Sequence, residues 1–134
     1  MLQPKKRKYR KEFRGKNTGV ALRGSTLAFG DYGLKTLTGG WLTSQEIEAA
    51  RKKITYATKR TGKYWIRIFP HKPVTKKPVG VKMGSGKGEI DYYVAVVKPG
   101  TILFEIGGVP LEIAQDAFAK AANKLSLRTK IVER

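Results

Sequence analysis

The sequence IDYYVAVVKPGTILFEI, residues 90–106, decides the fold of this chain. Apolar residues occupy both alternations of residues 90–97, which is typical of a central strand that is covered on both faces. Residues 98–100, KPG, form a turn sequence, and residues 101–106 form a second apolar strand. The stretch therefore predicts a β-hairpin, which ends at the glycine pair 107–108.

A helix is predicted before this hairpin, because Thr43 and Glu46 have the spacing of a capping box. The helix should continue to about Arg60, and Gly62 supplies its stop signal. Its apolar positions recur every three to four residues and form one stripe, Ile47, Ala50, Ile54 and Ala57. The stripe predicts that one side of this helix packs on the core.

A second helix is predicted after the hairpin. Pro110 suits its first turn, Glu112 lies near its start, and Lys120 and Lys124 lie near its end, an order that complements the helix dipole. Its apolar positions are Leu111, Ala114, Ala117, Phe118, Ala121 and Leu125. This pattern predicts a helix that packs on the core, and residues 127–132 follow as a final strand.

The segments before the hairpin predict further strands. Two apolar runs, residues 27–29 and 34–37, are separated by GDYG at 30–33, which predicts a strand, a turn and a strand. A glycine pair at 39–40 then breaks the chain before the first helix. Residues 64–69, YWIRIF, predict a strong strand, and residues 70–78 predict a basic, proline-bracketed connector.

The charge of the chain points to a polyanionic partner. The 134 residues include 28 Lys and Arg but only 10 Asp and Glu, for a net charge of +18. Twenty of these bases and only four of the acids lie in residues 1–80, so this part should face the polyanion. Nucleic acid is the first candidate and an acidic membrane surface is the second.

The composition also bears on several other classes of protein. The chain has no cysteine and a single histidine, so it has no disulfide and a zinc site is not expected. No apolar run approaches the roughly 20 residues that span a bilayer. The basic start is not followed by the apolar segment of a secretory signal. The first helix has few aromatic anchors, which disfavours membrane-surface binding.

The first 19 residues predict a basic N-terminal arm, which precedes a single domain at residues 20–134. Eight of the 19 are basic and one is acidic, so the segment cannot bury enough apolar surface to fold alone. Aromatic residues are interleaved with the charges, as expected where rings stack on bases. The alternative is a disordered tail. The candidate nucleic-acid-binding residues in the arm are Lys5, Lys6, Arg7, Lys8, Tyr9, Arg10, Lys11, Arg14 and Lys16.

The first helix predicts a basic ridge. At 100° per residue, its basic positions lie roughly opposite the apolar stripe. Little acidic charge is interleaved with them, which favours phosphate contacts over the alternative, a merely solvated surface. The candidate nucleic-acid-binding residues here are Arg51, Lys52, Lys53, Lys59 and Arg60.

Residues 81–88, VKMGSGKG, predict a projecting loop that meets an anion. Glycines allow close approach of the backbone to a ligand, and lysines add charge. The loop lacks the first glycine and the hydroxyl residue of a P-loop, and it lacks the third glycine of a dinucleotide fingerprint. The alternative is a mobile loop with solvated lysines. The candidate residues are Lys82, Met83, Gly84, Ser85, Gly86 and Lys87.

The sequence does not indicate an enzyme. Glu46 and Glu48 are two apart on a helix and therefore point in different directions, and the other carboxylates are scattered. His71 lies in a polar connector and is interpreted as a surface residue. We expect no catalytic residue, cofactor, metal or small-molecule substrate. A basic arm, a basic helix and a glycine-lysine loop together suit an irregular, three-dimensional RNA.

Several segments taken in order identify the chain as similar to the bacterial ribosomal protein L-sixteen family of the large subunit. The resemblance covers essentially the whole chain. It rests on residues 1–5 (MLQPK), 29–34 (FGDYGL), 42–51 (LTSQEIEAAR), 65–70 (WIRIFP) with 72–73 (KP), 83–88 (MGSGKG) and 97–100 (VKPG).

The resemblance implies an α+β fold of two layers, with two helices packed on a mostly antiparallel sheet. It implies a structural role in binding large-subunit rRNA near the peptidyl-transferase centre and the A site. In the family, the loop that matches Lys82 to Lys87 reaches towards A-site tRNA, and the arm threads into rRNA. Some members have Arg where Lys82 stands, and Lys lacks the planar fork of Arg.

The resemblance also implies partners and a location. The expected partners are rRNA, A-site tRNA and neighbouring large-subunit proteins, and the role includes subunit assembly. The start of the chain fits the family's mature N-terminus, so the expected location is the ribosome in the cytoplasm, with a plastid ribosome second. The alternative function is that of a free-standing RNA chaperone or regulatory RNA-binding protein.

Overall fold

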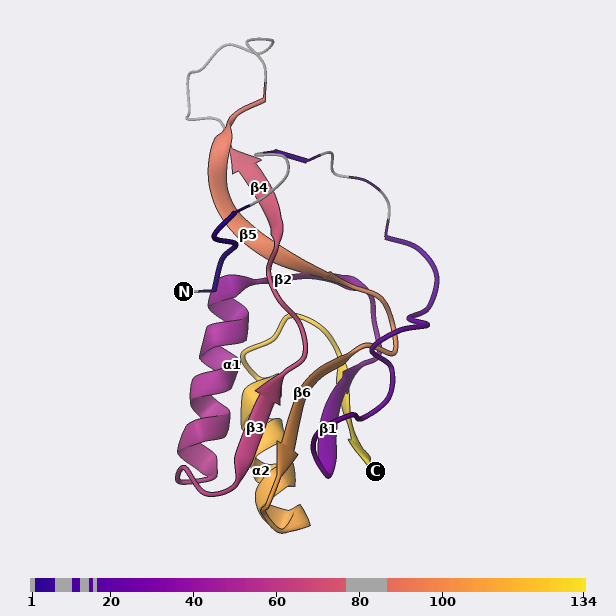
Figure 1. The fold of residues 1–134 in the computed structure, drawn as a ribbon, viewed down its shortest axis with the longest axis vertical. Helices are drawn as coiled ribbons and strands as arrows, with labels where there is room; N and C mark the ends of the chain where they lie inside the picture. The colour runs from indigo at the N-terminus through magenta and orange to yellow at the C-terminus, as the bar shows by residue number, and fades with distance from the viewer. Residues whose placement is uncertain (1, 7–10, 13–14, 16, 77–86) are drawn as a thin grey trace.

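The computed structural model describes residues 2–6, 11–12, 15, 17–76 and 87–134 as an α+β fold with two sheets (Figure 1). The four-stranded sheet has the order β3-β6-β1-β7, formed by Lys63–Ile66, Ile102–Gly107, Tyr32–Thr36 and Thr129–Glu133. The three-stranded sheet has the order β2-β5-β4, formed by Gly40–Thr43, Glu89–Val97 and Lys72–Lys76. Every strand pairing is antiparallel among the residues described, which confirms the expected fold class.

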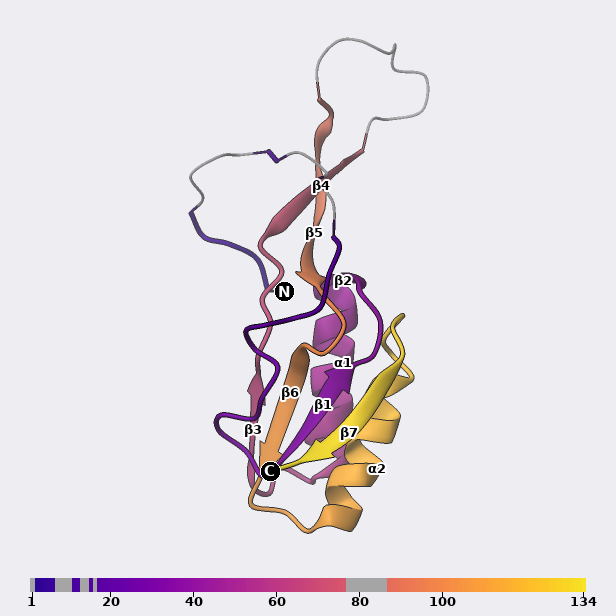
Figure 2. The ribbon, with the colours of Figure 1, turned by 90° about the vertical axis from the view of Figure 1, so that its right-hand side faces the viewer.

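Two helices pack against each other and cover one side of the four-stranded sheet (Figure 2). They are α1, Ser44–Ala57, and α2, Leu111–Ala122. The residues at the centre of this layer are fully buried and include Phe104 of β6, Phe118 of α2 and Ile54 of α1. Burial of each such side chain stabilises the fold by about 1.5–3 kcal/mol relative to exposure. Residues 17–30 run along the other side of this sheet.

The predicted hairpin at residues 90–106 is wrong. β5 is a central strand, as its apolar run predicted, and β6 is a central strand too, but they belong to different sheets. Pro99 and Gly100 turn the chain out of one sheet and into the other. β5 pairs with β2 and β4, while β6 pairs with β1 and β3. The stretch therefore joins the two sheets instead of closing one of them.

Three other expectations about strands also need correction. Residues 27–29 are not a strand, and the supposed turn at 30–33 already contains the start of β1. Gly40 begins a short strand, β2, whereas the sequence predicted only a break there. The basic connector contains β4, an edge strand whose Pro73 is buried opposite Tyr93. An edge strand tolerates proline because one side of its backbone needs no ladder donor.

The capping box at the start of α1 is confirmed. The Thr43 hydroxyl accepts the Glu46 N–H at 3.1 Å, and the Thr43 N–H donates to Glu46 Oε1 at 3.3 Å. The second carboxylate oxygen of Glu46 accepts the Ser126 N–H at 2.9 Å. One side chain therefore closes the first turn of α1 and also holds the chain that leaves α2.

The predicted apolar stripes are also largely confirmed. In α1, the stripe residues 47, 50 and 54 are fully buried and Ala57 is half-buried, but the helix ends at Ala57 instead of Arg60. In α2, the four central apolar residues are buried, and Pro110 is the N-cap instead of a residue of the first turn.

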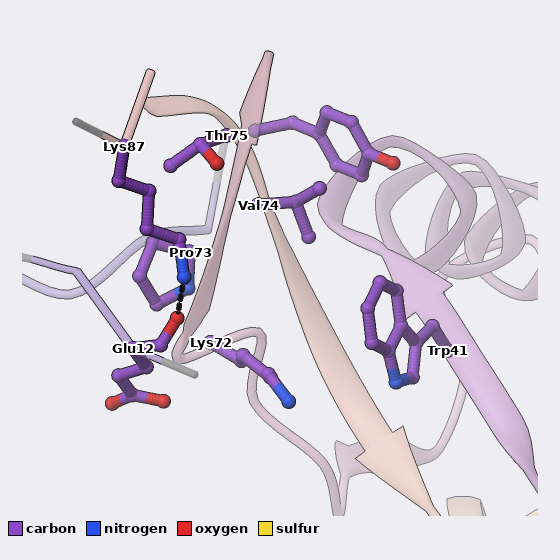
Figure 3. A pocket seen from close by; sticks show the side chains of 8 residues that line it. Glu12, Trp41, Lys72, Pro73, Val74, Thr75 and Lys87 are labelled. Atoms are coloured by element: carbon purple, nitrogen blue, oxygen red, sulfur yellow. Dashed lines mark hydrogen bonds between the residues drawn. The ribbon is translucent and has the colours of Figure 1, made fainter. Parts of the chain in front are cut away.

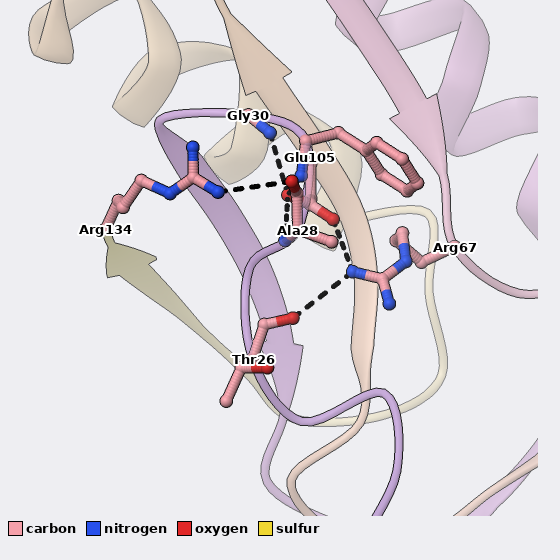
Figure 4. Close-up of polar contacts among 7 residues, drawn as sticks. Thr26, Ala28, Gly30, Arg67, Glu105 and Arg134 are labelled. Carbon is pink, nitrogen blue, oxygen red and sulfur yellow. Dashed lines mark hydrogen bonds and ion pairs between the residues drawn. The ribbon is translucent and has the colours of Figure 1, made fainter.

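A buried carboxylate on the central strand β6 fixes residues 26–30 to the four-stranded sheet (Figure 4). Glu105 Oε1 accepts the N–H groups of Ala28, Phe29 and Gly30 at 2.9–3.1 Å. Arg67 donates to Glu105 Oε2 at 2.5 Å and to the Thr26 carbonyl at 3.2 Å. Burial alone would raise the pKa of Glu105, but these donors outweigh it and the pKa lies below its ordinary value. Glu105 is therefore a charged structural anchor.

Candidate nucleic-acid interface

Most of the candidate rRNA-binding and tRNA-binding residues that the structure describes fall into two groups, which lie at opposite ends of the described part of the molecule (Figure 1). One group lies where the N-terminal arm meets the start of β5, and the other lies at the C-terminal end of α1. Several candidates lie outside the described residues: Arg7, Lys8, Tyr9, Arg10, Arg14, Lys16, Lys82, Met83, Gly84, Ser85 and Gly86. Lys5 and Lys6 are exposed in the arm, and Leu2 beside them packs against the hydrophobic core.

The structure brings one candidate from the arm and one from the loop together. Lys11 Nζ donates to the main-chain carbonyl of Lys87 at 3.0 Å, and Lys87 Nζ donates to the main-chain carbonyl of Glu12. We call this reciprocal contact of Lys11, Glu12 and Lys87 the arm–loop junction, and Figure 3 shows its hydrogen bond from Lys87 to Glu12. It places the arm against the base of the segment that carries the predicted loop. No sequence pattern predicted this contact, because Glu12 and Lys87 are 75 positions apart in the chain.

A cavity of about 320 Å³ lies beside the junction and is lined by residues of the arm, β2, β4 and β5. Lys72 of β4 lies over the Trp41 ring of β2, with 5.1 Å between its ammonium nitrogen and the ring centroid (Figure 3). Such a cation–π contact holds the lysine stem on the ring. Lys72 and Trp41 were not among the predicted site residues, because the apparent connector hid the strand that brings them together.

The second group forms a hollow of about 490 Å³ at the end of α1. We call its six lining residues the α1 cluster: Arg51, Lys52, Thr55, Tyr56, Lys59 and Arg60. The cluster contains four cations and no carboxylate. The bases at 51, 52, 59 and 60 lie together in this hollow, whereas Lys53 is half-buried outside it.

Arg51 differs from the other cations of the α1 cluster. Its guanidinium forms an ion pair with Glu48 one turn earlier and donates to the Tyr64 hydroxyl at 3.2 Å. The hydrogen bond from Arg51 holds the pKa of Glu48 below its usual range, and the same bond raises the pKa of Arg51. This pair was visible as an i,i+3 spacing in the sequence. Arg51 is therefore the cation of the cluster whose charge is already matched within the chain.

Tyr56, like Thr55, is a residue of the α1 cluster that the sequence pattern did not predict. Its side chain is 76% exposed, although a tyrosine ring is large and mostly apolar. A signal was present, because Tyr56 is four residues from Lys52 and therefore lies on the polar side of the helix. His71 is exposed, as predicted, and its Nδ1 lies 3.3 Å from the Phe69 carbonyl oxygen.

Within the described ranges, no group of three or more acidic or histidine side chains could hold a metal ion. None of the helices in those ranges is both long and apolar enough to cross a membrane. The cations of the two groups can bind negative charge, and the rings of Trp41 and Tyr56 can bind flat, polarisable rings.

Comparison with known proteins decides between the kinds of polyanion. Residues 4–132 match the family model described as ribosomal protein L16p/L10e. The chain belongs to this family. The large ribosomal subunit protein uL16 of Verminephrobacter eiseniae is 59% identical to it over 134 residues, which cover all of this chain and 97% of that relative. The proteins of the same name from Albidiferax ferrireducens and Delftia acidovorans are 58% and 57% identical over the same shares.

Membership of the L16p/L10e family confirms the resemblance that the sequence motifs indicated. The matched residues include both sheets, both helices and the whole α1 cluster. The family is one of structural ribosomal proteins and not of enzymes, which agrees with the scattered carboxylates of this chain.

Proposed function

We propose that this chain is a structural constituent of the large ribosomal subunit and binds large-subunit rRNA near the peptidyl-transferase centre and the A site. The observation that carries this proposal is the family match over residues 4–132. The net charge of +18 and the two basic groups at opposite ends suit an RNA that surrounds the protein. The chain supports assembly of the subunit and contacts A-site tRNA during translation.

The two groups have different roles in this proposal. The arm, residues 1–19, and the α1 cluster bind rRNA, while the domain formed by residues 20–134 presents the loop at 81–88 to A-site tRNA. The arm–loop junction supports this arrangement, because it holds the arm beside the strand that leads out of the loop. Neighbouring large-subunit proteins complete the environment of the chain on the ribosome in the cytoplasm.

The first test is the position of the protein in a sucrose gradient. We expect it to co-sediment with large subunits and whole ribosomes at moderate salt, detected by immunoblot. If it neutralises about six phosphates, its affinity for rRNA should fall with salt at a log–log slope of roughly −4 to −5. A protein found mainly outside ribosomal particles would instead be a free-standing RNA chaperone or regulator, and the proposal would fail.

The second test separates the arm from the loop. Deletion of residues 1–15 should weaken incorporation into large subunits, whereas Lys82→Ala should leave incorporation intact and weaken A-site tRNA binding. Lys87→Ala is the less selective variant, because Lys87 also contacts the arm at Glu12. Equal loss of incorporation in the arm deletion and in Lys82→Ala would refute the division of roles.

A further inference from the structure

The end of α1 has a backbone conformation that its residues do not favour. Lys59 and Arg60 have φ angles of +52° and +63°, in the left-handed region where glycine is normally found. The Lys59 N–H donates to the Tyr56 carbonyl, and the Arg60 N–H donates to the Thr55 carbonyl, both at 3.2 Å. These two bonds form a Schellman motif, in which Lys59 takes the position that glycine usually occupies.

The sequence does use glycine in this turn, but only where packing requires it. Gly62 has a φ of +69°, and a Cβ at this position would lie 2.4 Å from the Gly107 carbonyl oxygen. Two left-handed positions therefore carry long cations, at a conformational cost that glycine would remove. A cost of this kind is retained where the side chains themselves are needed.

The side chains that this turn positions surround an exposed ring. Tyr56, 76% exposed, lies between Lys52 one turn before it and Lys59 and Arg60 after it. The hollow is lined by cations and hydroxyl-bearing side chains, so it offers an anion several charged donors and a flat stacking surface. Phosphates alone would need only the cations, whereas the ring adds affinity for a base that is not stacked within a duplex.

We propose that Tyr56 stacks on an unpaired nucleobase of large-subunit rRNA, while Lys59 and Arg60, held in left-handed conformation, neutralise the adjacent phosphates. The proposal rests on the proposed function and adds to it the kind of nucleotide that the α1 cluster binds. The strained turn positions two cations next to the ring, and the rigid end of α1 positions the ring itself.

The stacking contact is tested by chemical probing of rRNA in purified large subunits that carry wild-type protein, Tyr56→Ala or Tyr56→Phe. We expect Tyr56→Ala to make a protected nucleotide reactive, and Tyr56→Phe to keep it protected because the ring remains. Binding of deproteinised large-subunit rRNA should weaken about tenfold in Tyr56→Ala. An unchanged reactivity pattern in Tyr56→Ala would overturn the proposal, as would loss of a contact to a neighbouring protein without any change in rRNA.

The role of the turn is tested with Lys59→Gly and Lys59→Ala. Lys59→Gly should raise the Tm by roughly 3–6 °C, because glycine relieves the left-handed strain. Both variants should reduce the magnitude of the salt slope for rRNA binding by about 0.7, because each removes one phosphate contact. Lys59→Ala should lack the gain in Tm.

Lys124→Gly is the matched control, because Lys124 follows the C-cap of α2 just as Lys59 follows that of α1, but without a positive φ. Lys124→Gly should leave the salt slope of rRNA binding unchanged, and it should not raise the Tm. Full rRNA affinity in Lys59→Gly would refute the phosphate contact. Wild-type protein that does not co-sediment with large subunits would instead refute the proposed function, so the two failures are distinguishable.

Discussion

The two sheets differ in what covers them and in what they carry. In the four-stranded sheet, every residue of the central strand β6 is buried, because the helices pack on one side and residues 17–30 on the other. In the three-stranded sheet, β4 buries only Pro73, and the buried residues of β5 lie in its C-terminal half. The first sheet therefore supplies most of the stability, and the second presents charge and rings at the surface. Substitutions in the four-stranded sheet should therefore mainly lower stability, whereas substitutions in the three-stranded sheet should mainly weaken RNA binding.

The largest effect on stability is expected at the centre of the four-stranded sheet. Phe104→Ala should lower the free energy of unfolding by about 3–5 kcal/mol, because Phe104 is 0% exposed and the layer around it can only partly collapse. Urea unfolding of the RNA-free protein measures this change. Phe69→Ala is the matched control in the connection between β3 and β4, where the residue is 44% exposed. Equal losses in both variants would contradict the contrast between the sheets.

A somewhat smaller loss is expected when the buried carboxylate is neutralised. Glu105→Gln should lower the free energy of unfolding by about 2–4 kcal/mol at neutral pH, because three N–H groups and Arg67 lose their charged acceptor. Glu133→Gln, at an exposed position of β7, is the control and should have little effect. A similar loss of unfolding free energy in both variants would show that the hydrogen bonds to the charged Glu105 carboxylate do not stabilise the fold.

The same carboxylate predicts the direction of the pH dependence. The pKa of Glu105 is lower in the folded chain than its ordinary value of 4.5, so its contribution to stability is fully present above that pH. The contribution is lost as pH falls through the folded-state pKa. Wild type should therefore lose more free energy of unfolding on acidification than Glu105→Gln does, as measured by urea unfolding between neutral pH and pH values below 4.5. Parallel pH profiles would contradict this assignment.

An intermediate effect is expected where the second sheet joins the helical layer. Thr43 is the last residue of β2 and the N-cap of α1, so Thr43→Ala should cost about 1 kcal/mol through loss of the cap. Thermal unfolding measures the change, and Thr18→Ala, in an exposed irregular segment, is the control. If the two variants melt together, the cap does not stabilise the junction between the layers.

The smallest effect on stability is expected at the arm–loop junction. Lys87→Ala should change the free energy of unfolding by less than about 0.5 kcal/mol, because Lys87 is exposed. It should nevertheless release the arm, which chymotrypsin would then cleave faster at Tyr9 and Phe13. Lys76→Ala, at the exposed end of β4, is the control. Unchanged cleavage in Lys87→Ala would show that the junction does not hold the arm.

The sequence predicted the elements of this fold better than their pairing. The capping box at Thr43 and the stripes of both helices depend on spacing within one segment, and the structure confirms them. The strand partners of residues 90–106 depend on contacts between distant segments. An apolar strand looks the same whether its neighbour is the next strand in the chain or a distant one. The short β2 and the proline-containing β4 carried too little pattern to reveal the second sheet.

The candidate site shows the same limit. The basic ridge of α1 follows from helical spacing, so four of its five predicted bases do lie together. The left-handed conformation at Lys59 and Arg60 has no local signal, because lysine and arginine favour other conformations. The contact of Lys11 with Lys87 joins two segments that no periodicity relates. Leu27 and Phe29 looked like a strand because their apolar pattern does not reveal that Glu105 binds the backbone beside them.

The position of β1 between β6 and β7 has a consequence for the order in which the chain can fold during synthesis. Leu34 of β1 lies opposite Phe104 on one side and Ile131 on the other. β1 therefore cannot complete its pairing until β6 and β7 have been synthesised. Contacts so distant in sequence make folding slow. A nascent chain whose first 80 residues carry most of its positive charge therefore remains open while translation proceeds. Until β7 has been synthesised, the basic segments of such a chain can also bind other polyanions.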